Sequence, residues 1–195
     1  MLLQDDIKEN ILDVAQSIFR KYGFKKTTMD EIAKAARKGK STLYYYFKSK
    51  EEIFAAVIEK EGNYMQNELM RIVTLNISSQ ATLKKYILAR MKLIDQVANL
   101  YDAIKDDYLS HYHFIQKYRE KYDEFEISIL KQMLIKGINS NEFEIDADKI
   151  DMVAFGLATA LKGLEIPFFL ENKYTEIERR LDSLLDILFY GIARE

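Results

Sequence analysis

Residues 42–51 read TLYYYFKSKE, four aromatic residues in a row with lysines beside them. On a helix, which turns about 100° per residue, Leu43 and Phe47 fall on the same side, one turn apart. Tyr45 lies roughly opposite them, flanked by hydroxyl-bearing and cationic side chains. Two apolar anchors and an outer face of hydroxyl and ammonium groups suit a surface that contacts a phosphate backbone. The segment therefore predicts a DNA-recognition helix.

Two predicted helices precede this segment. Apolar residues recur at helical spacing over about 6–22, which predicts a first helix ended by Gly23. Residues 28–31, TMDE, have capping-box spacing: the Thr28 hydroxyl accepts from the amide of Glu31, whose carboxylate reaches back. A short second helix therefore begins after Thr28, directly before the recognition helix.

The rest of the chain also has helical periodicity. Ser49 and Glu52 form a second capping-box pattern, which opens a longer helix with a kink or end expected at Gly62. About nine helices are expected in all, the later ones at about 80–103, 105–117, 119–138, 147–171 and 176–194. The clearest breaks between them are residues 139–141 and 171–173.

The composition of the 195-residue chain fits an all-α protein with a substantial core. Hydrophobic residues make up 48% of it, and seven glycines and one proline are few, which disfavours a turn-rich β fold. We expect an N-terminal three-helix helix-turn-helix domain over 1–48 and a C-terminal helical bundle over 49–195.

The residues also disfavour several kinds of site. Without cysteine the chain has no disulfide, thiolate nucleophile or cysteine-ligated metal. His111 and His113 are two apart on a predicted helix, so they point about 200° apart and do not hold one metal ion together. We expect neither a metal nor a cofactor. The N-terminus lacks an export signal and no apolar run approaches a membrane span, so we expect a cytoplasmic protein without a membrane partner.

Charge is distributed unevenly along the chain. Residues 1–50 contain 11 Lys and Arg against 6 Asp and Glu, a balance of +5. The remainder contains 18 against 25, a balance of −7. The basic N-terminal part, residues 1–50, and the acidic remainder indicate that the N-terminal part binds a polyanion while the rest of the chain does not. Ordinary scatter of surface charge is the alternative.

Residues 23–54 resemble the N-terminal domain of the tetracycline-repressor (TetR) family. The resemblance is carried, in register, by Gly23, Thr28-x-x-Glu31, Ile32-Ala33, Thr42-Leu43-Tyr44 and Phe47-x-x-Lys50-Glu51. It covers about the first quarter of the chain, and the remainder resembles the family only in its length and all-helical pattern.

This resemblance implies a ligand-responsive repressor that binds a palindromic double-stranded DNA operator as a homodimer, one recognition helix per major groove. A small molecule bound in the 49–195 domain, which also dimerises, would release the DNA. The positions imply DNA contacts from Thr28, Lys40, Ser41, Thr42, Tyr44, Tyr45, Tyr46, Lys48 and Lys50. Thr28 and Lys50 resemble phosphate contacts, because each stands at the N-terminus of a helix.

The turn before the recognition helix departs from the family pattern. The family usually has Gly where Arg37 stands and an apolar residue where Lys38 stands. An Arg in the left-handed conformation is strained by about 1–2 kcal/mol, so we expect Gly39 to take that conformation through a shifted turn. Alternatively, Arg37 and Lys38 add phosphate contacts.

Two sets of residues in the body are candidate sites. Aromatic residues around the histidines would suit an apolar or aromatic effector if a cavity exists; the candidates are Tyr108, His111, Tyr112 and Phe114. Small residues at i, i+4 and i+7 let a partner helix approach closely, and the resemblance implies a dimer interface of Gly156, Ala160, Gly163, Leu181, Leu184 and Leu188. Packing of the same faces within one chain is the alternative.

The chain offers little for catalysis. It has no Gly-rich phosphate loop and no Ser-His-Asp order, so we expect a regulator and not an enzyme. Two alternatives are an all-helical enzyme and a DNA-binding regulator whose body is a protein-interaction platform without an effector. The residues do not distinguish a repressor from an activator.

Overall fold

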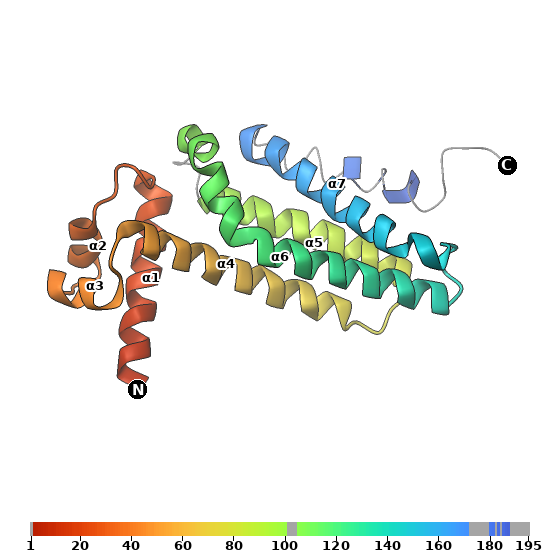
Figure 1. Cartoon of the computed structure of the whole chain (residues 1–195), viewed down its shortest axis with the longest axis horizontal. Coiled ribbons are helices and arrows are strands. Elements are labelled where there is room, and N and C mark those ends of the chain that lie inside the picture. The colour runs from red at the N-terminus through yellow and green to blue at the C-terminus, as the bar shows by residue number, and fades with distance from the viewer. Residues whose placement is uncertain (1, 101–104, 172–179, 182, 184, 188–195) are drawn as a thin grey trace. The chain divides into compact units, whose positions relative to one another are not determined.

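The computed structural model describes residues 2–100, 105–171, 180, 181, 183 and 185–187, and their side chains except at 2–4, 95–100, 105–119, 121 and 165–171. Every regular element in these residues is a helix, which confirms the all-α class (Figure 1). The elements are α1 (Leu2–Tyr22), α2 (Met29–Ala35), α3 (Lys40–Tyr46), α4 (Lys50–Val73), α5 (Ser79–Leu100), α6 (Lys105–Asn139), the 3-10 turn η2 (Ala147–Lys149) and α7 (Ile150–Glu171). None of the described helices is long and apolar enough to cross a membrane.

Of the kink or end predicted at Gly62, the end is wrong, and so is the break predicted between residues 117 and 119. α4 does not end at Gly62 but continues to Val73. One Gly in a helix costs only about 1 kcal/mol, which burial of Leu69 further along α4 offsets. Residues 105–138 form one helix instead of two, because no Gly or Pro interrupts them before Gly137. The predicted break at 139–141 is confirmed, and Asn141 takes a φ of 56° there.

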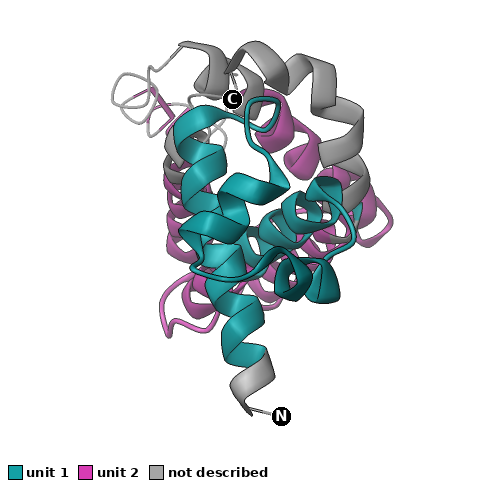
Figure 2. Cartoon of the chain, turned by 90° about the vertical axis from the view of Figure 1, so that its left-hand side faces the viewer, with its two compact units in different colours: residues 1–63, 97–120 teal, residues 64–96, 121–195 magenta. Residues whose placement is uncertain are grey.

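The chain divides into two compact units (Figure 2). Unit 1 comprises Met1–Asn63 and Val97–Glu120, and unit 2 comprises Tyr64–Gln96 and Lys121–Glu195. Each unit has its own hydrophobic core among the described residues.

Three phenylalanines form the centre of the core of unit 1. Phe19 of α1 lies 5.8 Å from Phe24 and 5.2 Å from Phe54 of α4, and Phe24 lies 4.8 Å from Phe54, all between ring centroids. The other buried members are Ile11, Leu12, Ala15, Ile32, Ala33, Ala36, Leu43, Phe47, Ile53, Val57 and Ile58. Residues of α1, α2, α3 and α4 therefore share one core, which fixes the two short helices on the two long ones.

Polar side chains join α1 to α4 at the edge of the same core. The Lys60 ammonium of α4 donates to Glu9 at 2.5 Å and to Asp13 at 2.8 Å, both on α1. The Gln16 side-chain amide donates to Glu61, a buried carboxylate, at 2.5 Å.

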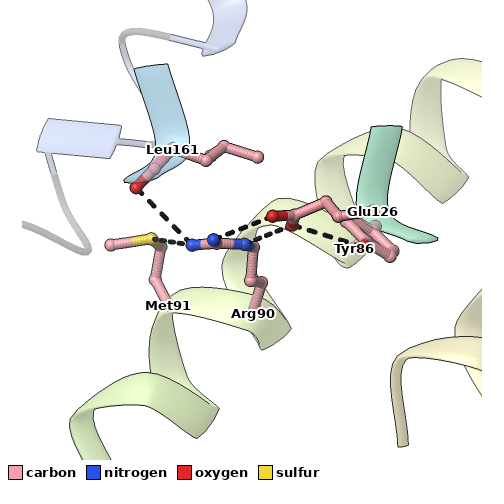
Figure 3. Close-up of polar contacts among 5 residues, drawn as sticks. All are labelled: Tyr86, Arg90, Met91, Glu126 and Leu161. Carbon is pink, nitrogen blue, oxygen red and sulfur yellow. Dashed lines mark hydrogen bonds and ion pairs between the residues drawn. The ribbon is translucent and has the colours of Figure 1, made fainter. Parts of the chain in front are cut away.

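A buried ion pair between Arg90 and Glu126 joins α5 to α6 in unit 2 (Figure 3). The guanidinium donates to both carboxylate oxygens, from Nε and, at 2.9 Å, from one Nη. Its other Nη donates to the carbonyl of Leu161 in α7 at 3.5 Å, and the Tyr86 hydroxyl donates to Glu126 at 3.4 Å. Burial raises the pKa of the Tyr86 phenol, and the charge of Glu126 raises it further. The cluster therefore links three helices of unit 2.

Candidate nucleic-acid interface

The recognition helix α3 is held by the two anchors that the sequence predicts. Leu43 has no exposed surface and Phe47, which ends the helix, is 2% exposed. Both belong to the core of unit 1, together with Ile32 and Ala33 of α2. The α2–α3 pair is thus fixed from its inner face, and the outer face of α3 is left for other contacts.

The predicted capping box at the start of α2 is confirmed. The Thr28 hydroxyl accepts from the Glu31 amide at 3.3 Å, and the Glu31 carboxylate accepts from the Thr28 amide at 2.8 Å. Thr28 itself is exposed. At the start of α4 the second box is altered: Ser49 accepts from the Glu52 amide at 3.2 Å, but the Glu52 carboxylate accepts from the amide of Lys48.

The turn between α2 and α3 is not shifted, and the expectation that Gly39 takes the left-handed conformation is wrong. Arg37 has a φ of 53°, whereas Gly39 has a φ of −68°. The Arg37 amide donates to Lys34 at 3.1 Å and the Lys38 amide donates to Ala33 at 2.9 Å, the bond pattern of a Schellman helix end. Arg37 therefore stands where such an end most often has Gly.

Tyrosines dominate the outer face of α3. Tyr44 is 44% exposed and Tyr45 is 66% exposed, while Tyr46 is half-buried and packs against the core. The rings of Tyr45 and Tyr46 meet edge to face with centroids 5.0 Å apart. Ser41 is exposed and Thr42 is half-buried. The hydroxyl-bearing residues predicted to contact DNA thus lie on one short helix, with Tyr44 and Tyr45 most accessible.

Lys40 and Lys48 stand at the two ends of α3 and are both exposed. The Lys40 ammonium lies 2.6 Å from the Asp30 carboxylate of α2, and this hydrogen bond and charge raise the pKa of Lys40. The Lys48 ammonium donates to the Tyr44 carbonyl at 3.2 Å. Both ammonium groups remain near the solvent-facing side of α3, in reach of an anion placed there.

Lys50, the first residue of α4, is oriented differently. Its ammonium donates to the Phe24 carbonyl at 2.7 Å and to the Thr27 carbonyl at 2.9 Å. The same group lies 4.3 Å from the centroid of the Phe24 ring. The sequence did not indicate these partners, which are 26 and 23 residues away along the chain.

The effector and dimer candidates are only partly within the described residues. The side chains of Tyr108, His111, Tyr112 and Phe114 fall outside them, as do Leu184 and Leu188. Gly156, Ala160 and Gly163 are exposed on α7, whereas Leu181 is 5% exposed and belongs to the core of unit 2.

Sequence reasoning missed two exposed apolar residues of α7. Met152 is 65% exposed and Phe155 is 59% exposed, close to the small residue Gly156. The available signal was helical spacing, because Met152 precedes Phe155 by three residues and Gly156 by four. Across the described residues no group of three or more His, Asp or Glu side chains is arranged to hold a metal ion.

The N-terminal helices match a known family. Residues 11–57 match the model of bacterial regulatory proteins, tetR family. Over 49 residues the chain is 51% identical to YhgD of Bacillus subtilis, an uncharacterized HTH-type transcriptional regulator. Over 65 residues it is 37% identical to IcaR of Staphylococcus epidermidis, the negative transcriptional regulator of the biofilm operon icaADBC. These segments are 25% and 33% of this chain, and 26% and 35% of those two proteins.

The likeness extends beyond these helices at the level of the fold. A transcriptional regulator from Cytophaga hutchinsonii superposes with a TM-score of 0.79 at 29% identity, over 93% of this chain and 96% of that one. Together with the helix-turn-helix geometry, these matches show that residues 11–57 form a helix-turn-helix segment like that of bacterial regulatory proteins of the tetR family, and that the chain shares its overall fold with a bacterial transcriptional regulator.

Proposed function

We propose that the protein is a repressor that binds a palindromic operator as a homodimer through α3 and is released by a small molecule. The observation that carries the proposal is the two-sided character of α3. Leu43 and Phe47 bury its inner face, while Tyr44 and Tyr45 are 44% and 66% exposed on its outer face. A helix fixed in this way can enter a major groove without losing its place on the domain.

The proposed DNA surface lies on residues 1–48, the DNA-binding domain. Ammonium and hydroxyl groups would bind phosphates, and tyrosine rings and the Thr42 methyl group would meet base edges in the groove. The direct contacts come from Thr28, Lys40, Ser41, Thr42, Tyr44, Tyr45, Tyr46 and Lys48. Lys50, at the start of α4, contributes to DNA binding through its bonds to the turn before Thr28. Arg37 and Lys38 extend the cationic surface beside α3.

Repression is the mode of regulation that the relatives support. IcaR, which matches this DNA-binding segment at 37% identity, is a negative regulator. A dimer bound across an operator repeat would exclude other proteins from that DNA. The protein would act in the cytoplasm, where the bacterial chromosome lies.

Dimerisation is assigned to residues 49–195 and, in particular, to α7. Met152 and Phe155 expose apolar surface, and a Cβ placed on Gly156 or Gly163 meets nothing within 4 Å. A second copy of the same helix could approach this face closely, with Ala160 at its centre. Leu184 and Leu188 would complete the interface, whereas Leu181, also expected there, is 5% exposed and packs in the core of its own chain.

The effector is proposed to bind the same C-terminal domain, with Tyr108, His111, Tyr112 and Phe114 as its candidate contacts. FadR of Bacillus subtilis, which has this fold at 22% identity and a TM-score of 0.66, was solved in complex with stearoyl-CoA. An apolar or aromatic small molecule is therefore the class to test, with stearoyl-CoA as the first probe.

DNase I footprinting on the gene's own upstream region tests the proposal. The expected result is one protected palindrome, occupied by a dimer in sedimentation velocity and vacated when an effector is added. Absence of protection at low salt, or protection spread along the whole fragment, would contradict it.

A further inference from the structure

The ammonium of Lys50 is bound to the turn that leads into α2. It donates 2.7 Å to the Phe24 carbonyl and 2.9 Å to the Thr27 carbonyl, and it faces the Phe24 ring at 4.3 Å. An ammonium has three N–H donors, so two of the three serve the protein's own backbone here. The Lys50 side chain is half-buried, in contrast to the exposed Lys48 two residues earlier.

The turn that Lys50 binds is also held from its inner side. Phe24 is 7% exposed and Thr27 is 1% exposed, and the Thr27 hydroxyl donates to the Gly23 carbonyl at 2.7 Å. The next residue, Thr28, is the N-cap of α2. Lys50 therefore ties the start of α4 to the residue immediately before the N-cap, across the core of unit 1.

This geometry differs from that of a lysine that neutralises a phosphate. Such a lysine keeps its ammonium in solvent, where it can neutralise a phosphate and release a cation condensed on the DNA. In Lys50 the ammonium is directed inward to two carbonyls and an aromatic face. Lys48 and Lys40 are exposed instead: the Lys48 ammonium donates to one carbonyl, that of Tyr44, and the Lys40 ammonium pairs with the exposed Asp30 carboxylate.

We propose that Lys50 is a positioning residue for DNA binding: it holds the 23–28 turn, and with it Thr28 and the first amides of α2, in the orientation that meets the phosphate backbone. It does so through the Phe24 and Thr27 carbonyls and not by neutralising a phosphate. This inference rests on the proposed DNA-binding function.

The test compares salt dependence among lysine variants of the full-length chain. Binding to the footprinted duplex is followed by fluorescence anisotropy between about 50 and 200 mM KCl. Lys50→Met removes the ammonium but keeps the unbranched stem, and Lys50→Arg keeps donors for both carbonyls. Lys48→Met is the control for loss of a charge that neutralises a phosphate. Lys60→Met is the control for loss of hydrogen bonds between α1 and α4 at a site away from the proposed DNA surface.

Lys50→Met is expected to weaken binding about tenfold at every salt concentration, with the slope of log K against log salt unchanged. Lys50→Arg is expected to recover most of the affinity. Lys48→Met is expected to make the slope shallower by about 0.9 for each phosphate that the lysine no longer neutralises. Lys60→Met is expected to lower the thermal midpoint without changing either binding quantity.

Hydrogen exchange of the DNA-free protein supplies the second readout. Amides of residues 24–30 are expected to exchange faster in Lys50→Met and at the wild-type rate in Lys48→Met. A shallower salt slope in Lys50→Met, unchanged affinity, or unchanged exchange at 24–30 would each overturn the positioning role. Failure of the wild-type protein to bind any DNA would instead overturn the proposed function, and the exchange data would still report whether Lys50 holds the turn.

Discussion

Arg37 takes the left-handed conformation in the turn between α2 and α3, and Gly39, two residues later, does not: their φ angles are 53° and −68°. The Lys38 amide donates to the Ala33 carbonyl at 2.9 Å, so the turn closes α2 as a regular helix end. The left-handed position is thus filled by a residue with a Cβ, which costs about 1–2 kcal/mol.

Replacement of Arg37 by Gly should therefore raise the free energy of unfolding. Relief of the strain outweighs the added freedom of Gly in the unfolded chain, about 0.5–1 kcal/mol, so we expect a gain of up to about 1 kcal/mol in urea unfolding. Gly39→Ala is the control, because its Cβ would meet Ser41 only at an ordinary 3.7 Å. A loss of stability in Arg37→Gly would show that the Arg side chain contributes more than its strain costs.

The buried ion pair of unit 2 gives a second prediction. Arg90→Met leaves the Glu126 carboxylate buried without its guanidinium, which should cost about 3–5 kcal/mol in the free energy of unfolding. The double variant Arg90→Met with Glu126→Leu should recover much of the loss, because neither charge then remains buried.

Lys131→Met is the matched control for that experiment. Lys131 pairs with Asp151 at 2.5 Å between α6 and α7, but both side chains are substantially exposed, at 42% and 77%. An exposed pair contributes about 0–1 kcal/mol, so the change should be small. If Arg90→Met and Lys131→Met lowered the free energy of unfolding equally, burial would not be the reason that loss of Arg90 is costly.

The lowered pKa of the Glu142 carboxyl group predicts how the free energy of unfolding depends on pH. The backbone amides of Ser79 and Gln80 lower the pKa of Glu142, with the Ser140 hydroxyl also donating to it at 2.8 Å. The pKa of Glu142 is lower in the folded protein than in the unfolded chain, so its ionised carboxylate stabilises the fold above about pH 4.3. This stabilisation is lost as the pH falls through the folded pKa. Urea unfolding of Glu142→Gln should show a deficit at pH 7 that disappears in acid. A deficit that is independent of pH would assign the effect to packing.

Local patterns in the sequence were sufficient for much of the DNA-binding head. Leu43 and Phe47 are predictable as buried anchors because helical spacing alone puts them on one side. The Thr28–Glu31 box is predictable because both partners lie within one turn of the chain.

The parts that could not be predicted depend on contacts between distant residues or on backbone angles. Lys50 is a plausible phosphate ligand from its position, but its bonds to Phe24 and Thr27 exist only after α1 and α4 have packed. The pairing of Arg90 with Glu126 spans 36 residues and leaves no periodic signal. At the α2–α3 turn, residue preference favours Gly39, but the helix-end hydrogen bonds place the left-handed residue at Arg37.

The exposed apolar residues of α7 predict a dimer whose interface includes Phe155. Phe155→Glu puts a charge on a residue that is 59% exposed in one chain, so the fold should survive while the dimer dissociates. Light scattering after gel filtration should then give the mass of one chain in place of two. Tyr64→Glu, at a tyrosine that is 56% exposed on α4, should keep the dimer mass. An unchanged mass for Phe155→Glu would move the interface away from this face.

The most direct measurement of the central claim is operator binding by Tyr44→Ala, followed by fluorescence anisotropy on the footprinted duplex and on a scrambled duplex. Tyr44 is 44% exposed on the outer face of α3, and Tyr22→Ala is the control, at a tyrosine that is 51% exposed on α1. The account predicts that Tyr44→Ala weakens operator binding by about tenfold or more and leaves the weak affinity for scrambled DNA nearly unchanged. Tyr22→Ala should alter neither affinity. Equal operator affinity for wild-type protein and Tyr44→Ala would contradict the assignment of α3 as the helix that reads DNA.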